Sequence, residues 1–267
     1  MSKDNKQEVS SGSVDEAAND PLAAKLRKLA ISAPPRRRCD IRYLLCLDIE
    51  ATFDKGLPFN RNTHEVIELP CVLVDLERLV IVDEFHTFVK PTRDTTLSNF
   101  CIKFTGISQA MVDMAPTFPE AMDMLSAFMK KHSDKLHPHP IEFGLPSRLT
   151  GPRNYAWVTH GTADIERFMC LRSCHINRVR LPTYMQGQYI DLKALFKSYS
   201  KERHYRGLDD MLRCFGYTFS GREHSGLQDA RQVAKITMLL LERTNTEIKC
   251  NRSVFMSPNF AFTARTL

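Results

Sequence analysis

Two carboxylates, Asp48 and Glu50, directly follow the apolar run Tyr43–Leu47 in this 267-residue chain. The run predicts a buried strand. Residues i and i+2 of a strand point to the same face, so both acids emerge side by side. Two neighbouring anions in a desolvated position repel each other, and a divalent cation would offset that cost. The alternative is that the strand ends here and both acids reach water.

Three further residues capable of metal or acid–base chemistry lie in the second half of the chain. Asp164 follows the apolar segment Tyr155–Thr159 at the start of a helical pattern, and Asp229 begins the last helical pattern, five residues after His224. Each acid taken singly is explained equally well as a helix N-terminal carboxylate that complements the helix dipole. His224 taken singly reads as an ordinary surface histidine.

Taken in chain order, the four acids and the histidine resemble the DEDDh exonucleases. The local matches are to the subgroup of 3′ exoribonucleases that includes the histone mRNA 3′ exonuclease and the enhanced-RNA-interference nucleases. The matching segments are Leu47–Thr52, Glu65–Pro70, Ser98–Ile107, Thr117–Pro119 and Gly221–Gly226. The resemblance covers roughly residues 42–242.

The resemblance implies a ribonuclease H-like α/β fold, with a mixed five-stranded sheet flanked by helices. It implies that Asp48, Glu50, Asp164 and Asp229 hold two Mg²⁺ or Mn²⁺ ions, that Glu50 is also catalytic, and that His224 is the general base. Two ions about 3.5–4 Å apart activate water and stabilise the leaving oxygen. Histidine, with an ordinary pKa of about 6.5, accepts the water's proton near neutral pH. The implied reaction releases nucleoside 5′-monophosphates from RNA with a free 3′ end.

The resemblance also assigns substrate contacts. Phe100 and Phe104 would stack on or wedge against the terminal bases, at about 1–3 kcal/mol per base; their i,i+4 spacing equally fits two core rings on a helix. Backbone amides at Ala51 and Thr52 would meet the 3′ hydroxyl, and His224 would also touch the substrate. Basic candidates for the RNA path, which equally fit a solvated helix face, are Lys193, Lys197, Lys201, Arg203 and Arg206.

The chain departs from the subgroup at two places. Where the subgroup has Asp-Gly-x-Trp-Asp, residues 160–164 read HGTAD, so the aromatic residue beside the third acid is missing. Base stacking on that side of the pocket is therefore left open. The proline-rich segment 138–153 is longer than expected and is interpreted as a loop that is a candidate lid or substrate-facing loop.

Periodicity predicts the elements that must position these residues. Further strands are predicted at Val66–Val74 and Leu79–Val89, and the short link between them favours an antiparallel hairpin. Helices are predicted at Ser108–Asp113, Phe118–Lys131, Ala163–Cys174 and Gln228–Leu241. This order favours a mixed sheet covered by helices. We expect a flexible tail at 1–40, an exonuclease domain at 41–243 and a C-terminal extension at 244–267.

Composition excludes several classes of protein. Hydrophobic residues make up 43% of the chain, enough for a real core, and no run reaches the about 18 apolar residues of a membrane span. No membrane partner is therefore expected. Cys46, Cys71 and Cys101 lie in apolar runs, and no second ligand pair accompanies Cys170, Cys174 and His175, so neither a disulfide framework nor a zinc site is favoured. The N-terminus lacks a signal core, and we expect an intracellular protein, in the cytoplasm or nucleus rather than the mitochondrion.

Charge divides the chain into an acidic and a basic half. Residues 41–147 carry 10 basic and 15 acidic side chains, whereas residues 148–267 carry 19 and 10. Basic groups that hold a polyanion beside acids that hold a cation would produce this division. An ordinary solvated surface would produce it too.

Two other functions stay open from the sequence. The first is a DNA exonuclease of the same fold, because carboxylate chemistry barely distinguishes the sugars and no motif specifies a contact to the 2′-hydroxyl. The second is a non-catalytic RNA-binding module that keeps the fold. The complete set of acids disfavours this second alternative.

Overall fold

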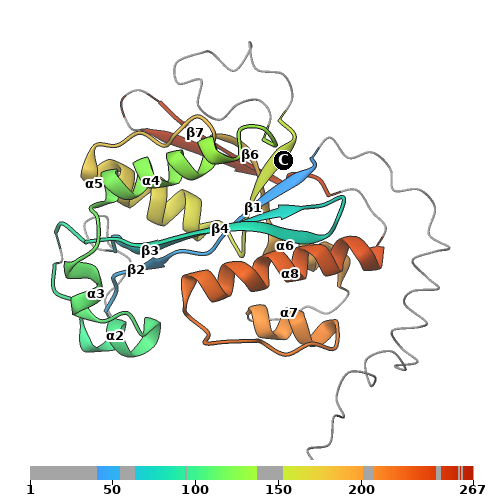
Figure 1. Cartoon of the computed structure of the whole chain (residues 1–267), viewed down its shortest axis with the longest axis horizontal. Coiled ribbons are helices and arrows are strands. Elements are labelled where there is room, and N and C mark those ends of the chain that lie inside the picture. The colour runs from blue at the N-terminus through green and yellow to red at the C-terminus, as the bar shows by residue number, and fades with distance from the viewer. Residues whose placement is uncertain are drawn as a thin grey trace, which may run out of the picture. The chain divides into compact units, whose positions relative to one another are not determined.

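The fold is known from a computed structural model, shown in Figure 1. The structure describes residues 41–54, 64–93, 95–136, 153–200, 207–244, 248–257, 259 and 261–266. All of them belong to the larger of two compact units, residues 38–267. The predicted tail at 1–40 and the candidate lid up to residue 152 lie outside the described residues.

A mixed sheet of eight strands forms the centre of this unit. Its strands are β1 (Tyr43–Leu47), β2 (Glu50–Ala51), β3 (Val66–Asp75), β4 (Val80–Phe88), β5 (Tyr155–Thr159), β6 (Gly187–Asp191), β7 (Arg252–Met256) and β8 (Phe262–Thr266). Strand β3 pairs antiparallel with β1, β2 and β4, which confirms the predicted hairpin. Strands β1, β5 and β6 run parallel to one another, and β7 and β8 continue the sheet in antiparallel pairing.

The α/β class is confirmed, but the sheet is larger than the five strands predicted. The strands that periodicity did not predict carry weak patterns: β2 has only two residues, and β6 begins with Gly187 and Gln188 before its buried pair Tyr189 and Ile190. Strands β7 and β8 come from the segment 244–267 and contain several polar residues. They join the sheet through pairing with β6, a long-range contact that local periodicity does not reveal.

Helices cover both faces of the sheet (Figure 1). They are α2 (Asn99–Thr105), α3 (Gln109–Asp113), α4 (Phe118–Lys131), η2 (Ala163–Cys174), α5 (His175–Asn177), α6 (Leu192–Tyr199), α7 (Leu208–Cys214) and α8 (Gly226–Thr244). The segment Ala163–Cys174 is helical as predicted, but it is wound as a π-helix, a form found often at functional sites. Among the described residues, none of these helices combines the length and apolar character needed to traverse a bilayer.

The core is divided by strand β1 into two layers. Leu45 and Leu47 pack on one face among residues of α4 and η2, whereas Leu44 and Cys46 pack on the other face among residues of α6, α7 and α8. All five residues of β1 are buried because side chains alternate between two covered faces. The strand that leads to Asp48 is therefore held rigidly on both sides.

Candidate active site

The carboxyl ends of three parallel strands meet at one edge of the sheet. Leu47 at the end of β1 pairs with Thr159 of β5, which in turn pairs with Asp191 of β6. In open α/β sheets, ligands bind outside the carboxyl ends of the strands. The residues that follow these ends, Asp48 after β1 and Asp164 after β5, are therefore placed where a site is expected.

The four predicted acids gather at this edge. Asp48 and Glu50 flank Ile49, whose backbone N–H donates to Oδ1 of Asp164 at 3.2 Å. This bond joins the end of β1 to the first turn of η2 across 115 residues of sequence. Asp229 arrives from the first turn of α8.

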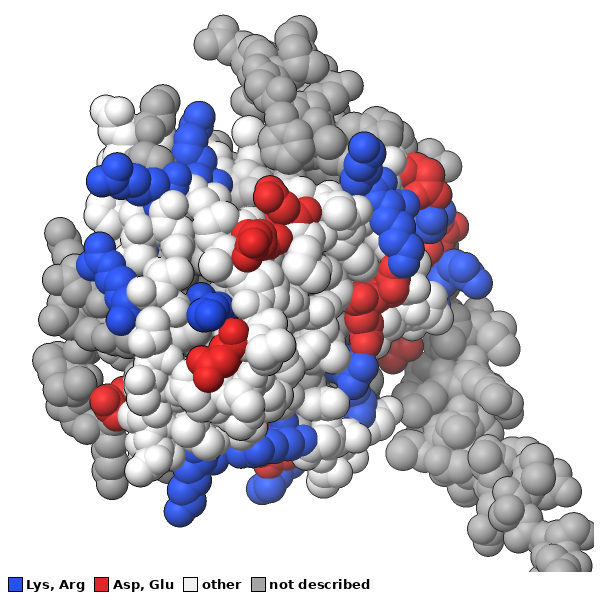
Figure 2. All heavy atoms as spheres, turned by 60° about the vertical axis from the view of Figure 1, so that its left-hand side comes forward, with Lys and Arg blue, Asp and Glu red and all other residues white. Residues whose placement is uncertain are grey.

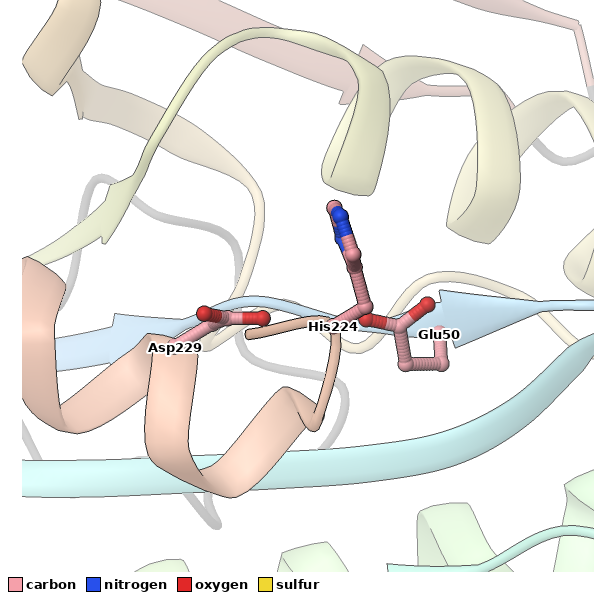
Figure 3. Close-up of side chains that lie close together, drawn as sticks. All are labelled: Glu50, His224 and Asp229. Atoms are coloured by element: carbon pink, nitrogen blue, oxygen red, sulfur yellow. The ribbon is translucent and has the colours of Figure 1, made fainter. Parts of the chain in front are cut away.

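Glu50, His224 and Asp229 bring their side chains together (Figure 3). One ligand atom from each lies within 4.8 Å of those of the other two. Glu50 and Asp229 are buried, whereas His224 is exposed. Among the residues that the structure describes, no other set of three or more His, Cys, Asp and Glu side chains converges in this way.

Burial, with crowding of the acids, raises their pKa values. Burial, with the charges of Asp229, Glu68 and Asp164, raises the pKa of Glu50 to about 8. Burial raises the pKa of Asp164 and of Asp229 to about 7 each, against hydrogen bonds from backbone N–H groups. The pKa of Asp48 is raised well above its ordinary value by burial and by the charges of all four neighbouring acids. Such a set of oxygen donors fits divalent cations, which stabilise the charged carboxylates.

His224 lies at the start of α8 in an unusual backbone conformation. Its φ is +62°, in the left-handed region that residues other than glycine rarely adopt. Its imidazole stacks on Phe104, with ring centroids 3.8 Å apart and planes 24° apart. Partial burial lowers its pKa, as does the charge of Arg222, while Glu223 opposes the shift. The imidazole is therefore favoured in the neutral form that accepts a proton.

Comparison with known proteins fits this geometry. The family model for Exonuclease (RNase_T) matches residues 45–143. The "3'-5' exonuclease eri1" of Schizosaccharomyces pombe is 36% identical over 218 residues, which are 79% of this chain and 72% of that protein. The human "3'-5' exoribonuclease 1" is 31% identical over 213 residues, which are 79% of this chain and 56% of that protein.

Solved structures agree with these relatives. The nuclease domain of 3'hExo, a DEDDh family member bound to rAMP, has a TM-score of 0.67 and is 31% identical, over 80% of this chain and 98% of that chain. A 3'-exonuclease described in recognition of the histone mRNA stem-loop has a TM-score of 0.70 and is 28% identical, over 85% of this chain and 91% of that chain. This chain belongs to the DEDDh 3′-to-5′ exoribonucleases.

In this exoribonuclease, the ring of Phe104 stacks on His224, and the ring of Phe100 stacks on Phe104. Both are partly exposed on α2, so they are not core rings. Their rings are stacked with centroids 5.9 Å apart, and Phe53 meets both edge-on at 5.5 and 5.1 Å. Phe53 is not among the residues predicted from the sequence, because its position next to these rings depends on the packing of α2 against the chain after β2.

Ala51 is the last residue of β2, Thr52 follows it, and both are buried. Thr52 exchanges hydrogen bonds with Glu65: its N–H donates to the Glu65 carbonyl at 2.8 Å, and its Oγ1 accepts the Glu65 N–H at 2.9 Å. The Thr52 amide is therefore already paired within the fold. The carbonyl of Ala51 lies 3.8 Å from Sγ of Cys101, which fixes α2 against this strand.

Glu68 of β3 is a fifth acid at the site whose role the sequence does not reveal. It lies opposite Glu50 in the strand register. Its carboxylate accepts the N–H of Gly226 at 2.9 Å and of Leu227 at 3.1 Å, and contacts Nε2 of His86 at 2.9 Å. It thereby satisfies the free backbone donors at the start of α8. The signal for Glu68 was its place in the matching segment Glu65–Pro70.

Gly226 allows α8 to approach the first strand closely. A Cβ at this position would lie 2.6 Å from the carbonyl oxygen of Asp48, a distance that real Cβ atoms do not reach. Glycine is required here for close approach of two backbones. This approach is what brings Asp229, one turn further along α8, to the acids of the sheet edge.

His160 lies directly after β5 and is the first residue of segment 160–164, where the chain differs from the subgroup. Burial, with the charge of Lys193, lowers its pKa to about 4, so it is a neutral side chain near neutral pH. The N–H of Lys193 donates to the His160 carbonyl at 3.0 Å. Of the predicted basic path, Lys193 and Lys197 lie on α6, and the other three residues lie outside the described part of the chain.

None of the cysteines that the structure describes belongs to the cluster of ligand atoms at this site. The seven that the structure describes are free thiols. Cys170 and Cys174 are buried in η2, while His175 is exposed, so these three do not converge as metal ligands. Burial raises the pKa of both thiols, which disfavours the thiolate that zinc binds.

Proposed function

We propose that this exoribonuclease removes nucleoside 5′-monophosphates one at a time from the free 3′ end of single-stranded RNA or of an RNA overhang, in RNA processing or turnover. The observation that carries the proposal is the convergence of Glu50, His224 and Asp229 within 4.8 Å, from segments far apart in the sequence. Asp48 and Asp164 adjoin this group through the end of β1.

The residues that would hold the metal ions are Asp48, Glu50, Asp164 and Asp229. Two ions, Mg²⁺ or Mn²⁺, would supply activation of the attacking water and stabilisation of the leaving 3′ oxygen. The raised pKa values of these acids indicate that their charges are not balanced by basic side chains of the site. A carboxylate cage of this kind suits cations that prefer oxygen ligands.

His224 is proposed as the general base, whose imidazole nitrogen takes the proton of the attacking water. Its lowered pKa keeps the imidazole neutral at physiological pH. Stacking on Phe104 restricts rotation of the ring while the ring remains exposed to substrate. Glu50 is proposed to contribute to catalysis next to His224.

The terminal nucleotides are proposed to bind against Phe100 and Phe104. Stacking of this kind accepts any base, which fits an enzyme that removes residues in turn. His224 and the backbone at Ala51 would meet the terminal sugar; the Thr52 amide is paired with Glu65, so Thr52 would support this contact rather than make it. Lys193 and Lys197 are proposed as phosphate contacts further along the strand.

The basic side chains on the face shown in Figure 2 do not form one broad basic surface. In Figure 2, basic side chains stand in separate groups and acidic ones lie between them.

We further propose that residues 41–243 form the exonuclease domain and that the protein acts inside the cell, in the cytoplasm or nucleus rather than the mitochondrion. Strands β7 and β8 extend the sheet of that domain.

The test is digestion of a 5′-labelled RNA with Mg²⁺ or Mn²⁺. We expect a ladder of products shortened from the 3′ end, release of nucleoside 5′-monophosphates, and slower digestion of a DNA strand of the same sequence. Asp48→Ala should abolish the product ladder, the release of monophosphates and the digestion of DNA. Intact RNA with the wild-type protein, or equal digestion by Asp48→Ala, would contradict the proposal, and a preference for DNA would correct the substrate class.

A further inference from the structure

The segment that carries His224 is attached to the rest of the protein on both sides of the histidine. On its C-terminal side, the N–H of Gly226 donates to Glu68, as described above. On its N-terminal side, the guanidinium of Arg222 reaches helix α2. Nη2 of Arg222 donates to the carbonyl of Lys103 at 3.0 Å and lies 3.5 Å from that of Phe104.

The contact of Arg222 is made where a helix has free acceptors. Lys103 and Phe104 belong to the last turn of α2, whose final carbonyls lack partners within the helix. A cation at the C-terminal end also complements the helix dipole. A guanidinium suits this place because it is always charged, and a single nitrogen, Nη2, carries two N–H groups and lies near both carbonyls.

Gly106 makes room for the guanidinium. This residue ends α2 with a φ of +77°, and its N–H donates to the Ile102 carbonyl. A Cβ at this position would overlap the guanidinium of Arg222. Gly106 is therefore required both for the left-handed end of the helix and for the seat of Arg222.

The same helix also holds the imidazole. Phe104 stacks on both His224 and Phe100. The rings that are proposed to receive the terminal base are therefore in contact with the proposed general base. A residue other than glycine at a positive φ persists only when its surroundings hold it. For His224 those surroundings are the Phe104 ring, the Arg222 contact and the anchored start of α8.

We propose that Arg222 is a positioning residue that docks the His224 segment on the C-terminal end of α2, so that the helix that receives the terminal base also sets the place of the general base. This inference rests on the proposed function of the site. Arg222 is not among the proposed metal ligands or substrate contacts, and its hydrogen bonds are to the backbone of α2. It acts through His224.

The first test is the variant Arg222→Ala, assayed for RNA digestion at saturating Mg²⁺. We expect kcat to fall about 10–100-fold, which is the loss expected when a catalytic group is displaced by up to about 1 Å. We expect KM to change less than about threefold and Mn²⁺ affinity by calorimetry to stay the same, because the carboxylates are untouched. The control is Arg213→Ala, which removes an exposed arginine paired with Asp209 on α7 and should leave kcat unchanged.

A double-mutant cycle separates positioning from a general structural effect. In the His224→Ala background, Arg222→Ala should cause no further loss of kcat, because its effect passes through the missing imidazole. An equal loss in both backgrounds would overturn the inference, as would full kcat in Arg222→Ala. If that variant fails to fold, Arg222→Lys serves instead and should retain part of the activity, since an ammonium keeps the positive charge but lacks the planar guanidinium that fits this place.

Gly106→Ala tests whether the space beside Gly106 is needed for the guanidinium of Arg222. The added methyl group should expel the guanidinium, so the loss of kcat should match that of Arg222→Ala, and the two changes combined should cost no more than either alone. Proton–carbon NMR of the His224 ring, assigned with His224→Ala, gives a readout that needs no activity. The Phe104 ring current should be lost in Arg222→Ala; an unchanged His224 signal would overturn the docking even if the proposed reaction proved wrong.

Discussion

The carboxylate of Glu68 accepts the backbone N–H of Gly226 at 2.9 Å, and this bond ties strand β3 to the first turn of α8. Because Glu68 lies opposite Glu50 in the sheet, it sets the distance between Glu50 and the helix that carries Asp229. Its charge also raises the pKa of Glu50 and Asp229. One residue thus holds the start of α8 beside the sheet and adds to the effect of burial on the acids of the proposed metal site.

Glu68→Ala should lower both stability and activity. Loss of two backbone contacts at the start of α8 is expected to cost about 1–3 kcal/mol in the free energy of unfolding, measured by urea denaturation. Metal affinity should fall as well, since Asp229 is no longer anchored. Glu68→Gln keeps one acceptor oxygen and should lose less stability; an identical loss in both variants would show that the hydrogen bonds are not what holds the helix.

Stability of the metal-free protein should decrease as the pH rises from about 5 to 8. The acids whose pKa values are raised to about 7 and 8 keep their protons in the folded state, whereas the unfolded chain releases them near pH 4. The folded state therefore binds more protons over this range, and the free energy of unfolding falls with pH. Thermal melting in EDTA at several pH values measures this effect.

Metal should reverse that dependence. Saturating Mg²⁺ binds the deprotonated carboxylates, so the increase in melting temperature should be larger at pH 8 than at pH 6. Asp48→Asn removes one of the crowded charges and should flatten the metal-free pH dependence. A wild-type melting temperature that rises with pH in EDTA would contradict the assigned pKa directions.

His224→Ala should separate catalysis from metal binding. We expect kcat to fall about 10²–10⁴-fold, as for loss of a general base. Mn²⁺ affinity, measured by calorimetry, should change far less than in Asp229→Ala, which removes a proposed ligand. The reverse ranking of the two variants would exchange their roles.

Phe100→Ala should weaken RNA binding without altering metal affinity. Loss of one stacking surface is worth about 1–3 kcal/mol, or roughly 5–150-fold in the dissociation constant. Fluorescence anisotropy with a labelled single-stranded RNA, in the His224→Ala background to prevent digestion, measures it. Tyr217→Ala, which removes a half-exposed ring that contacts Lys235 on α8, is the control and should bind RNA as its parent does.

Local sequence determined the elements and the types of residue at the site. The run Tyr43–Leu47 is apolar at every position and predicted a buried strand, with Asp48 and Glu50 at its end, and the structure has this strand buried at all five residues. The amphipathic pattern Phe118–Lys131 is helical with the bounds predicted. These features depend on neighbours within one turn or one strand, which is why periodicity and spacing were enough.

Tertiary structure alone decided how these parts meet. Glu68 and Arg222 act through contacts across 158 and 119 residues of sequence, and no local pattern distinguishes them from solvated side chains. The same holds for β7 and β8, which become strands because β6 offers an edge to pair with. The four acids could be named from the sequence. Their raised pKa values arise only in the folded protein, because folding buries the four carboxyl groups close to one another.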